Sequence, residues 1–467
     1  MNLICVSGSS GVGKTTVSKI IESVLGSNQC VCLSGDDLHL WERTDPMWKI
    51  KTHLNPESNN LDLGYEQIVN LLNGNSIQRR MYNHDTGKFD SEVKIEAKSY
   101  LVYEGLHALY HENTNKLAHL KIFVDTDESL KTEWKTKRDV KKRGYTEKQV
   151  LDTMQRRKGD ESRYITPQKK NADVVVKFTK NKDASISLEY VSINGKGMEL
   201  MEKVKDFYDS MIDFMNICKW LSLDPSLVQG RGGNVSVKSN SGLVIKASGA
   251  KMADVNLYHG FCVCDINTNF PKFSNETDYN EFIQVSKKMG QTRPSMETGF
   301  HAAIKEKVVV HTHPIHLNAI LCSKEGKTLI KNLFNDLTYE YVEYVRPGAE
   351  LTNAISKQKN IVFLENHGLV VSSDNPQEAF ETTERINNRC KRWLSNHVES
   401  FVDVEESEEK NLPLFPDAAV FPEEMQATNN YILGLLSTAC LTPKFLNTDE
   451  INSLLSMESE KYRKALI

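Results

Sequence analysis

Four residues near the start of the chain match the spacing of a phosphate-binding loop. The segment GSSGVGKTT places Gly8, Gly13, Lys14 and Thr15 in the pattern G-x-x-x-x-G-K-[ST]. Glycines let backbone N–H groups close around phosphates, the lysine reaches the terminal phosphates, and the threonine hydroxyl can hold Mg²⁺. A β-prone run precedes this loop and a helical pattern follows it. That context argues against a glycine-rich turn without function.

Two acidic residues follow later β-prone runs in the same half of the chain. Asp36 comes just after CVCLS, and Glu104 ends the run SYLVYE. In a doubly wound sheet, such strand ends face the nucleotide site. Asp36 could therefore be the base of a phosphoryl transfer, and Glu104 is well placed to order Mg²⁺ or its waters.

Basic residues are concentrated between positions 131 and 143. Such a run is usually a solvated helix face, and an RNA-binding stripe is a second alternative. Beside a phosphate loop, we interpret it as a lid that neutralises charge on the transferring phosphoryl group. The run contains Lys131, Lys135, Lys137, Arg138, Lys141, Lys142 and Arg143.

Three histidines in the second half have the spacing of a metal site. His311 and His313 lie two apart in the β-prone string VVVHTHP, so their side chains share one face. His367 follows a further β-prone run, in NIVFLENHGLVV. Three imidazoles with an open position are typical of catalytic rather than structural zinc. Isolated histidines on strands are more often core residues, and we interpret His301, His316 and His397 in that way.

Small-residue turns and one glutamate lie near these histidines in the sequence. GRGGNVSVK and ASGAK have a composition suited to cradling a phosphate, although both could equally be tight hairpin turns. Glu297 stands at the expected start of a helix in RPSMETGFHAAI. Beside a metal ion it could act as an acid or base, and the alternative is a helix start capped by Ser295.

The amino-acid composition limits the classes of protein to which the chain can belong. With 467 residues, 26% charged residues and a net charge of -4, we expect two or three soluble domains that bind small molecules rather than nucleic acid. The start of the sequence lacks a signal peptide pattern, and no apolar run is long enough to span a bilayer. We therefore expect a cytoplasmic protein without membrane contact.

A change of pattern near residue 197 predicts a domain boundary. The β-prone run ISLEYVSINGKG is followed by the amphipathic helical pattern MELMEKVKDFYDSMIDFMNICKWL, with Gly195 and Gly197 between them. We expect domains at 1–196 and 197–467, the second with a core at about 200–400 and a C-terminal extension at 401–467. The acidic segment at 402–410 is interpreted as a solvated linker.

Six strings in the first 180 residues resemble the phosphoribulokinase and uridine kinase family: GSSGVGKTT, DDLHLWER, YNHDTGKFD, YEGLHALY, RDVKKRGYT and RYITPQKKNADVVV. The resemblance implies a P-loop kinase with a doubly wound parallel sheet that uses ATP and Mg²⁺. It implies that Asp36 is the general base, with Asp37 as its rival, and that Lys14, Thr15 and Glu104 serve ATP and Mg²⁺. Asp139 would be a second acidic partner. The residues expected to bind ATP phosphates are Gly8, Ser9, Ser10, Gly11, Val12, Gly13, Lys14, Thr15 and Thr16. Those expected to hold the sugar phosphate are His39, Arg43, Tyr82, Lys135, Arg138 and Arg143.

The second half resembles the class II aldolase and adducin family, which includes fuculose-1-phosphate aldolase. The resemblance implies an α/β/α domain around a mainly antiparallel sheet, with His311, His313 and His367 as ligands of Zn²⁺ or Mn²⁺. Glu297 would be the catalytic acid/base. It also implies a homotetramer. The residues expected to bind the substrate phosphate are Gly233, Asn234, Ser248, Gly249 and Ser295.

Together, the two halves predict a bifunctional sugar-phosphate enzyme. We expect the first half to phosphorylate a ketose or ketose phosphate at O1 with ATP, and the second to catalyse metal-dependent aldol cleavage or condensation. The alternatives are that the second half is an epimerase, dehydratase or decarboxylase of the same family, or that one half is a degenerate scaffold.

Overall fold

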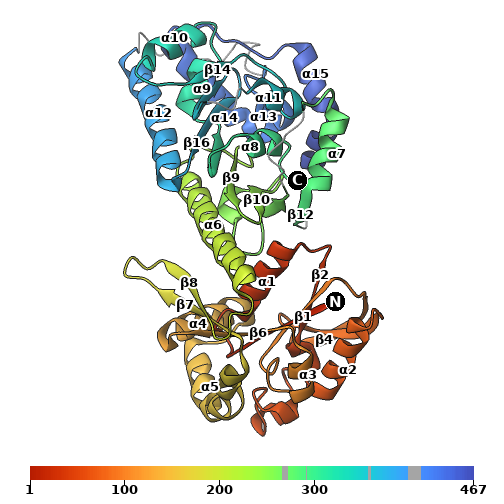
Figure 1. Cartoon of the computed structure of the whole chain (residues 1–467). Helices are drawn as coiled ribbons and strands as arrows, with labels where there is room; N and C mark the ends of the chain where they lie inside the picture. The colour runs from red at the N-terminus through yellow and green to blue at the C-terminus, as the bar shows by residue number, and fades with distance from the viewer. Residues whose placement is uncertain (266–271, 291, 356–358, 398–411, 467) are drawn as a thin grey trace. The chain divides into compact units, whose positions relative to one another are not determined.

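The computed structural model describes residues 1–265, 272–290, 292–355, 359–397 and 412–466. These residues divide into two compact units, Met1–Asp209 and Ser210–Ile467 (Figure 1). The division falls inside a single long helix, α6, which runs from Met198 to Ser222. The domain bounds of 1–196 and 197–467 therefore stay a proposal. The acidic segment at 402–410 lies outside the described residues.

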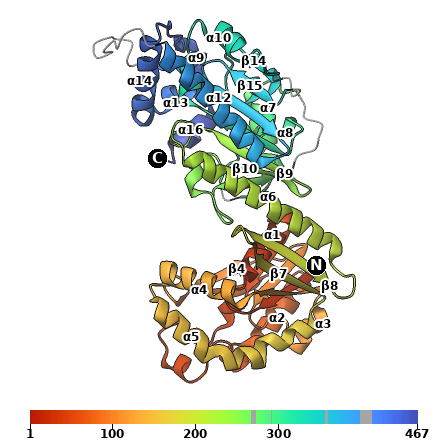
Figure 2. The same ribbon diagram turned by 90° about the vertical axis from the view of Figure 1, so that its left-hand side faces the viewer.

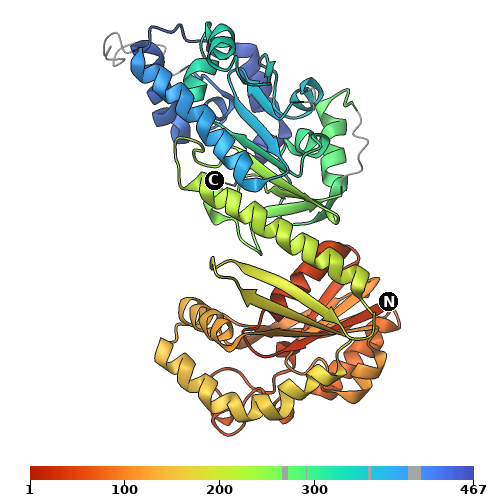
Figure 3. The ribbon, with the colours of Figure 1, turned by 60° about the vertical axis from the view of Figure 1, so that its left-hand side comes forward.

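The first unit is built on a six-stranded sheet of order β2-β5-β1-β6-β7-β8. The strands from β2 to β7 in this order are parallel, and β8 pairs antiparallel with β7 in the hairpin drawn in yellow in Figure 3. The elements are β1 (Asn2–Gly8), α1 (Lys14–Leu25), β2 (Cys30–Ser34), η1 (Gly35–Leu38), η2 (Pro46–Lys49), η3 (Pro56–Ser58), α2 (Leu61–Leu72), β3 (Ile77–Asn83), β4 (Lys88–Ile95), β5 (Tyr100–Gly105), α3 (Glu112–Leu117), β6 (Leu120–Thr126), α4 (Glu128–Arg143), α5 (Glu147–Asp160), η4 (Glu161–Ile165), η5 (Thr166–Asn171), β7 (Val174–Lys180) and β8 (Ile186–Ser192).

Strand β1 is buried on both faces. Leu3 and Cys5 pack in one cluster with Ile68 of α2, while the alternate residues Ile4 and Val6 are buried as well. A parallel sheet covered by helices on both sides requires such continuous apolar strands. The register aligns the carboxyl ends of β1, β2 and β5, so the segments that follow β1 and β2 meet the end of β5 at one edge of the sheet.

The second unit is built on an eight-stranded sheet of order β12-β11-β10-β9-β13-β16-β15-β14. All neighbours are antiparallel except the β14–β15 pair. The elements are β9 (Asn234–Ser239), β10 (Gly242–Lys246), η6 (Met252–Asp254), β11 (Phe261–Cys264), α7 (Glu276–Ser286), β12 (Lys287–Met289), α8 (Thr298–Ala303), β13 (Val308–Thr312), α9 (Ile315–Leu321), α10 (Gly326–Leu333), β14 (Glu340–Val342), α11 (Ala349–Ala354), β15 (Ile361–Leu364), β16 (Gly368–Ser373), α12 (Pro376–Asn396), α13 (Pro416–Val420), α14 (Pro422–Thr438), α15 (Thr448–Ser456) and α16 (Glu458–Lys464).

Helices cover both faces of this sheet. Val309 of β13 and Val370 of β16 form a core with Phe300 of α8 and Leu351 of α11. The long helix α12 lies along the sheet, where it contacts β13 and β16 (Figure 2). The predicted fold class is therefore confirmed in both units: a parallel P-loop-type sheet in the first, and an α/β/α arrangement around a mainly antiparallel sheet in the second.

Within the described residues, the helices are too short or too polar to cross a lipid bilayer. The nine cysteines, all of them described, form no disulfide bond.

Candidate functional sites

The phosphate loop connects the end of β1 to the start of α1. Gly13 has a φ of 95°, and a Cβ atom at this position would lie 2.7 Å from the ring of Phe178. Gly11 has a φ of 90°, and its Cβ would lie 3.0 Å from the Cβ of Lys135 on α4. A left-handed backbone without space for a side chain requires glycine at both positions. Ser9, Ser10 and Val12 complete this turn after Gly8, and Thr15 and Thr16 begin the helix with Lys14.

Lys14, Thr15 and Glu104 meet at the carboxyl ends of β1 and β5. The Lys14 ammonium donates to the carbonyl of Ser9 (2.8 Å), and the Thr15 hydroxyl donates to Glu104 Oε1 (3.3 Å). Burial lowers the pKa of Lys14 and raises the pKa of Glu104, and the charge of each opposes the shift of the other. A hydroxyl beside a carboxylate, next to a phosphate loop, is a donor set suited to Mg²⁺.

The two neighbouring aspartates have different surroundings. Asp37 is buried: its carboxylate accepts from Arg79 Nε (3.1 Å) and from the backbone N–H of Tyr82 (2.7 Å). Asp36 Oδ2 lies 3.2 Å from Nε2 of His84. Burial alone would raise the pKa of Asp36, but its hydrogen bond with His84 and nearby positive charges bring it well below its usual value. Asp37 is thus held by structural contacts, whereas Asp36 contacts titratable groups of the site.

Three of the six predicted sugar-phosphate residues, Arg43, Tyr82 and Arg143, contact His84. His39 packs edge-on against Tyr82, and Tyr82 against His84, with ring centroids 5.3 and 5.2 Å apart. Arg43 donates to the carbonyl of His84, and Arg143 Nη2 lies 3.0 Å from His84 Nδ1. The sequence interpretation did not include His84. His84 stands two positions after Tyr82, near the end of β3. This spacing places two side chains on the same face of a strand, and it was the signal in the sequence that could have indicated His84.

Three members of the basic run converge on Asp139. Its carboxylate contacts Lys135 (2.9 Å), Arg138 (2.8 Å) and Arg143 (3.3 Å). Lys135 and Arg138 also approach the Ser10 hydroxyl, at 3.4 and 3.5 Å. Burial would raise the pKa of Asp139, but the hydrogen bond from Arg138 and the charge of Lys135 bring it to about 2. Asp139 is therefore a fixed anion that orders three cations beside the phosphate loop.

The remaining basic residues divide between two environments. Lys137, Lys141 and Lys142 are exposed on α4, as a solvated helix face requires. Lys131 is buried and pairs with Glu161 (2.8 Å), which also accepts from the Ser9 hydroxyl. Glu161 begins the π-helical turn η4, and no sequence pattern indicated its contact with the loop.

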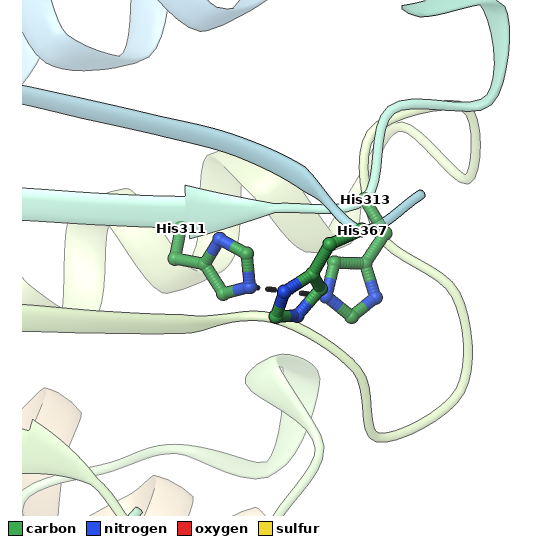
Figure 4. A group of neighbouring side chains, drawn as sticks. All are labelled: His311, His313 and His367. Atoms are coloured by element: carbon green, nitrogen blue, oxygen red, sulfur yellow. Dashed lines mark hydrogen bonds between the residues drawn. The ribbon is translucent and has the colours of Figure 1, made fainter. Parts of the chain in front are cut away.

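The three predicted histidines form a cluster in the second unit (Figure 4). His311 lies on β13, His313 follows the end of that strand, and His367 precedes β16, its antiparallel neighbour. All three are buried, and one nitrogen atom of each lies within 4.8 Å of the others. His301 and His316 are buried outside this cluster: His301 bonds the Ser236 hydroxyl (2.8 Å). His397 is exposed at the C-terminal end of α12, so its interpretation as a core residue was wrong.

Hydrogen bonds define which nitrogen atoms of the cluster are available. His311 Nδ1 donates to the Leu369 carbonyl (3.0 Å), and His313 Nδ1 faces an oxygen of Asp417 (3.2 Å), so both Nδ1 atoms carry the proton. The two Nε2 atoms lie 3.1 Å apart, a hydrogen-bonding distance at which one proton is shared between them (Figure 4). Burial lowers the pKa of His311, which disfavours a second proton there. A divalent metal ion can take the place of the shared proton, so these nitrogen atoms fit a metal site.

Glu297 lies directly beside the cluster. Its two carboxylate oxygens are each 3.5 Å from a ring nitrogen, Oε2 from His311 Nε2 and Oε1 from His367 Nε2. Asn234 Nδ2 donates to Oε2 (2.6 Å) and so orients the carboxylate. Helix α8 starts at Thr298 with Glu297 as its N-cap residue and no side-chain cap. The Ser295 hydroxyl accepts from the Glu297 N–H (3.3 Å) but does not cap the helix.

The five predicted phosphate-binding residues line one cavity together with this site. Its empty volume, counted with the open solvent at its mouth, is about 440 Å³, and Glu297, His313 and His367 also line it. The N–H of Ser248 already donates to the Arg293 carbonyl (2.9 Å), so a phosphate contact at this residue falls to the side chain. The predicted residues in the wall are Gly233, Asn234, Ser248, Gly249 and Ser295.

Part of the cavity wall comes from residues that the sequence interpretation missed. Arg231 and Lys246 stand within the strings GRGGNVSVK and GLVIKASGAK, and Asp417, Glu460 and Arg463 come from the C-terminal helices α13 and α16. Arg231 and Lys246 could have been found from their place in these strings. The C-terminal residues lie in short helices without a recognisable motif.

Two family models match separate parts of the chain. The phosphoribulokinase / uridine kinase family matches residues 3–185, and the class II aldolase and adducin N-terminal domain matches residues 212–394. Uridine kinase from Ligilactobacillus salivarius is 32% identical over 178 residues, which cover 37% of this chain and 84% of the relative. The chain therefore belongs to the phosphoribulokinase/uridine kinase family through its first unit, and its second unit contains a class II aldolase domain. Both predicted resemblances are confirmed.

Other relatives match over part of their length. Phosphoribulokinase from Synechocystis sp. is 40% identical over 174 residues, 37% of this chain and 52% of the relative. The chain thus spans about half the length of the curated phosphoribulokinases that it matches. The solved N-terminal class II aldolase domain of a conserved protein from Thermoplasma acidophilum is 23% identical, with a TM-score of 0.35, and covers 39% of this chain and 92% of that chain. Family membership implies ATP and Mg²⁺ for the first unit and a divalent metal ion for the second.

Proposed function

We propose that the chain is a bifunctional sugar-phosphate enzyme. The first unit transfers a phosphoryl group from ATP to O1 of a ketose or ketose phosphate, and the second performs aldol cleavage or condensation of a sugar phosphate. The observation that carries this proposal is that each unit keeps a set of reactive groups at one site. The first unit has Lys14, the Thr15–Glu104 pair and the His84–Asp36 pair, and the second has the histidine cluster with Glu297. We further propose a cytoplasmic homo-oligomer, a tetramer by family resemblance.

In the kinase reaction, Asp36 is the proposed general base. It accepts the proton of the acceptor hydroxyl while the hydroxyl oxygen bonds to the γ-phosphorus and the bond to ADP breaks. The choice over Asp37 is supported by the contacts of Asp37 with Arg79 and Tyr82, which occupy its carboxylate. Thr15 and Glu104 would hold Mg²⁺, which would neutralise charge on the phosphates.

The basic residues near the loop have a separate role in this step. Lys14 bonds the terminal phosphates, and Lys135 and Arg138, which approach the Ser10 hydroxyl, offset the charge that develops on the transferring group. His39, Arg43, Tyr82 and Arg143 are the proposed contacts of the sugar phosphate.

In the second unit, Glu297 is the proposed acid/base. In the cleavage direction Glu297 takes the proton of the C4 hydroxyl, and the C3–C4 bond breaks to give an aldehyde and leaves its electron pair on the three-carbon fragment. Glu297 then returns the proton to C3, which yields dihydroxyacetone phosphate. A Zn²⁺ or Mn²⁺ ion on His311, His313 and His367 would polarise the substrate carbonyl. Asn234 holds the carboxylate of Glu297 in place for this transfer.

The cavity supports a coupling between the two reactions. A phosphate placed on C1 by the kinase would occupy the wall formed by Gly233, Ser248, Gly249 and Ser295, next to the histidine cluster. The carbonyl at C2 would then lie toward that cluster.

Mass spectrometry of ATP-dependent products from a panel of ketoses and ketose phosphates tests the proposal. The wild-type chain should give two carbon fragments, Lys14→Ala should give no phosphorylated product, and His311→Ala should stop after phosphorylation. A phosphate at a terminus other than C1 would refute the coupling. An unchanged mass after the second step would indicate epimerisation, and loss of water or CO₂ would indicate dehydration or decarboxylation.

A further inference from the structure

The metal-site cavity includes a chain of charged groups from the C-terminal helices. Asp417 Oδ2 lies 3.2 Å from His313 Nδ1, and Asp417 Oδ1 accepts from Arg463 Nη2 (2.9 Å). Arg463 Nη1 in turn donates to both carboxylate oxygens of Glu460 (3.0 Å each). These residues come from α13 and α16, beyond the family-model match that ends at residue 394.

The first link of this chain, between Asp417 and His313, is deeply buried. The Asp417 side chain is 4% exposed and that of His313 is 8% exposed. Within the described part of the chain, Oδ2 has no hydrogen-bond partner, and its contact with His313 is an ion-pair contact at 3.2 Å. A buried carboxylate is costly to desolvate unless it is paired. The His313 imidazole is therefore the group that can offset the charge on this oxygen.

Gly232 gives a second, independent observation on the same pair. A Cβ atom at this glycine would lie 2.6 Å from Asp417 Oδ2 and 2.9 Å from His313 Nδ1. Its φ is not in the left-handed region, so space rather than backbone conformation requires glycine here. The string GRGGN thus leaves room for the carboxylate to reach the imidazole.

The contact fixes the state of a proposed metal ligand. A carboxylate on Nδ1 keeps the proton on that nitrogen, so Nε2 carries the lone pair and points toward His311 Nε2. A carboxylate on the remote nitrogen also makes the imidazole a stronger donor and holds the ring in orientation. Arg463 orients Asp417 by occupying its other oxygen.

Apolar contacts also hold the C-terminal helices on the unit. Leu414, Phe415, Leu436 and Leu454 belong to one buried cluster with Ala319 of α9. Apolar burial of this kind contributes about 25 cal/mol per Å². The attachment of these helices therefore does not depend on Asp417 alone, which leaves its position beside a proposed metal ligand to be explained.

We propose that the C-terminal segment completes the metal site: Asp417, held by Arg463, is the positioning residue that orients His313 as a ligand. This inference rests on the proposed metal site of the second unit. It makes residues 412–466 part of the catalytic architecture, so removal of this segment should impair metal binding.

Metal affinity of the full chain tests this inference by chelator competition with Zn²⁺. Asp417→Asn should weaken Zn²⁺ binding by about 10–100-fold, and Arg463→Met should weaken it less. Asp417→Glu should restore part of the affinity because it keeps a carboxylate. Lys461→Gln, an exposed change on the same helix as Arg463, is the matched control and should bind as the wild type does.

Co²⁺ substitution gives a readout that a structural role would not change. The visible absorption spectrum of the Co²⁺ form should shift in Asp417→Asn and stay unchanged in Lys461→Gln. If Asp417→Asn fails to fold, Gly232→Ala, which places a methyl group against the same pair, should give the same spectral shift. Wild-type affinity and spectrum in the Asp417 and Gly232 variants would overturn this inference alone. Absence of bound metal in the wild-type chain would overturn the proposed metal site as well.

Discussion

The imidazole of His84 bonds the carboxylate of Asp36, with Nε2 3.2 Å from Oδ2. Arg143 lies 3.0 Å from the other ring nitrogen, Nδ1. A guanidinium can only donate, so Nδ1 accepts and the single proton of a neutral imidazole stays on Nε2. His84 therefore donates to Asp36 and holds the carboxylate in its charged form.

Substitution of His84 should change the pH dependence of phosphorylation. Burial would raise the pKa of Asp36, and the hydrogen bond from His84 is the main opposing effect. In His84→Asn the pKa of Asp36 should rise, because the hydrogen bond that offsets the effect of burial is lost. The acid limb of kcat against pH should move to higher pH, since more alkaline solution is needed to deprotonate the base. An acid limb at the wild-type position would contradict this assignment of the tautomer.

The adjacent aspartates should respond differently to the same substitution. Asp36→Asn should lower kcat by about 10²–10⁴-fold with an unchanged free energy of unfolding, because it removes a proton acceptor. Asp37→Asn should lower the free energy of unfolding by about 3–5 kcal/mol, because it leaves the buried Arg79 without its charged partner. Urea unfolding and ATP-dependent phosphorylation measured on both variants check the pair. Equal loss of kcat without loss of stability in Asp37→Asn would favour Asp37 as the base.

Glu297→Gln should separate metal binding from proton transfer in the second unit. The amide oxygen can still accept from Asn234, but the side chain can no longer exchange a proton. Turnover at the second site should fall by about 10²–10⁴-fold, while metal content and kinase activity stay as in the wild type. Glu423→Gln, an exposed change at the start of α14, is the control. Loss of metal together with activity would instead make Glu297 a ligand.

Gly13→Ala should weaken ATP binding without unfolding the first unit. An alanine at a φ of 95° costs about 1–2 kcal/mol, and its methyl group would press on Phe178. We expect the Kd for ATP to rise by at least about tenfold, measured by calorimetry. Gly159→Ala on α5, where no atom lies within 4 Å of the added Cβ, should leave ATP binding unchanged and stabilise the helix by about 0.5–1 kcal/mol. Equal Kd values for the two variants would argue against a nucleotide at this loop.

Both folds and most residues of the two candidate sites could be predicted from the sequence, because each motif requires particular secondary structure around it. The loop of Gly8 to Thr15 needs a strand before it and a helix after it, and HTH on a strand places His311 and His313 on one face. The structure has the strand and the helix on either side of the loop, and it places His313 directly after the strand that carries His311, in the same cluster. The ambiguity between Asp36 and Asp37 could not be resolved in the same way, because it depends on Arg79, which is far away in sequence.

The missed residues share a physical reason. Glu161, Asp417 and Arg463 reach their sites through contacts between segments far apart in the chain, and nothing in their local periodicity marks the side chain that turns inward. The boundary between the two units, which lies inside α6, could not be predicted either. A continuous helical pattern gives no signal at the point where the packing partners of the helix change.

Asp139 holds Lys135, Arg138 and Arg143 in place through three ion pairs. Long basic side chains lose about 2 kcal/mol of rotamer entropy each when they are fixed. Here that loss occurs during folding, so a phosphate that arrives at this face meets donors that are already ordered. The affinity of this face for a phosphate would then depend on how readily the three basic side chains exchange the carboxylate of Asp139 for the phosphate. It would depend less on the entropy lost when flexible side chains are immobilised.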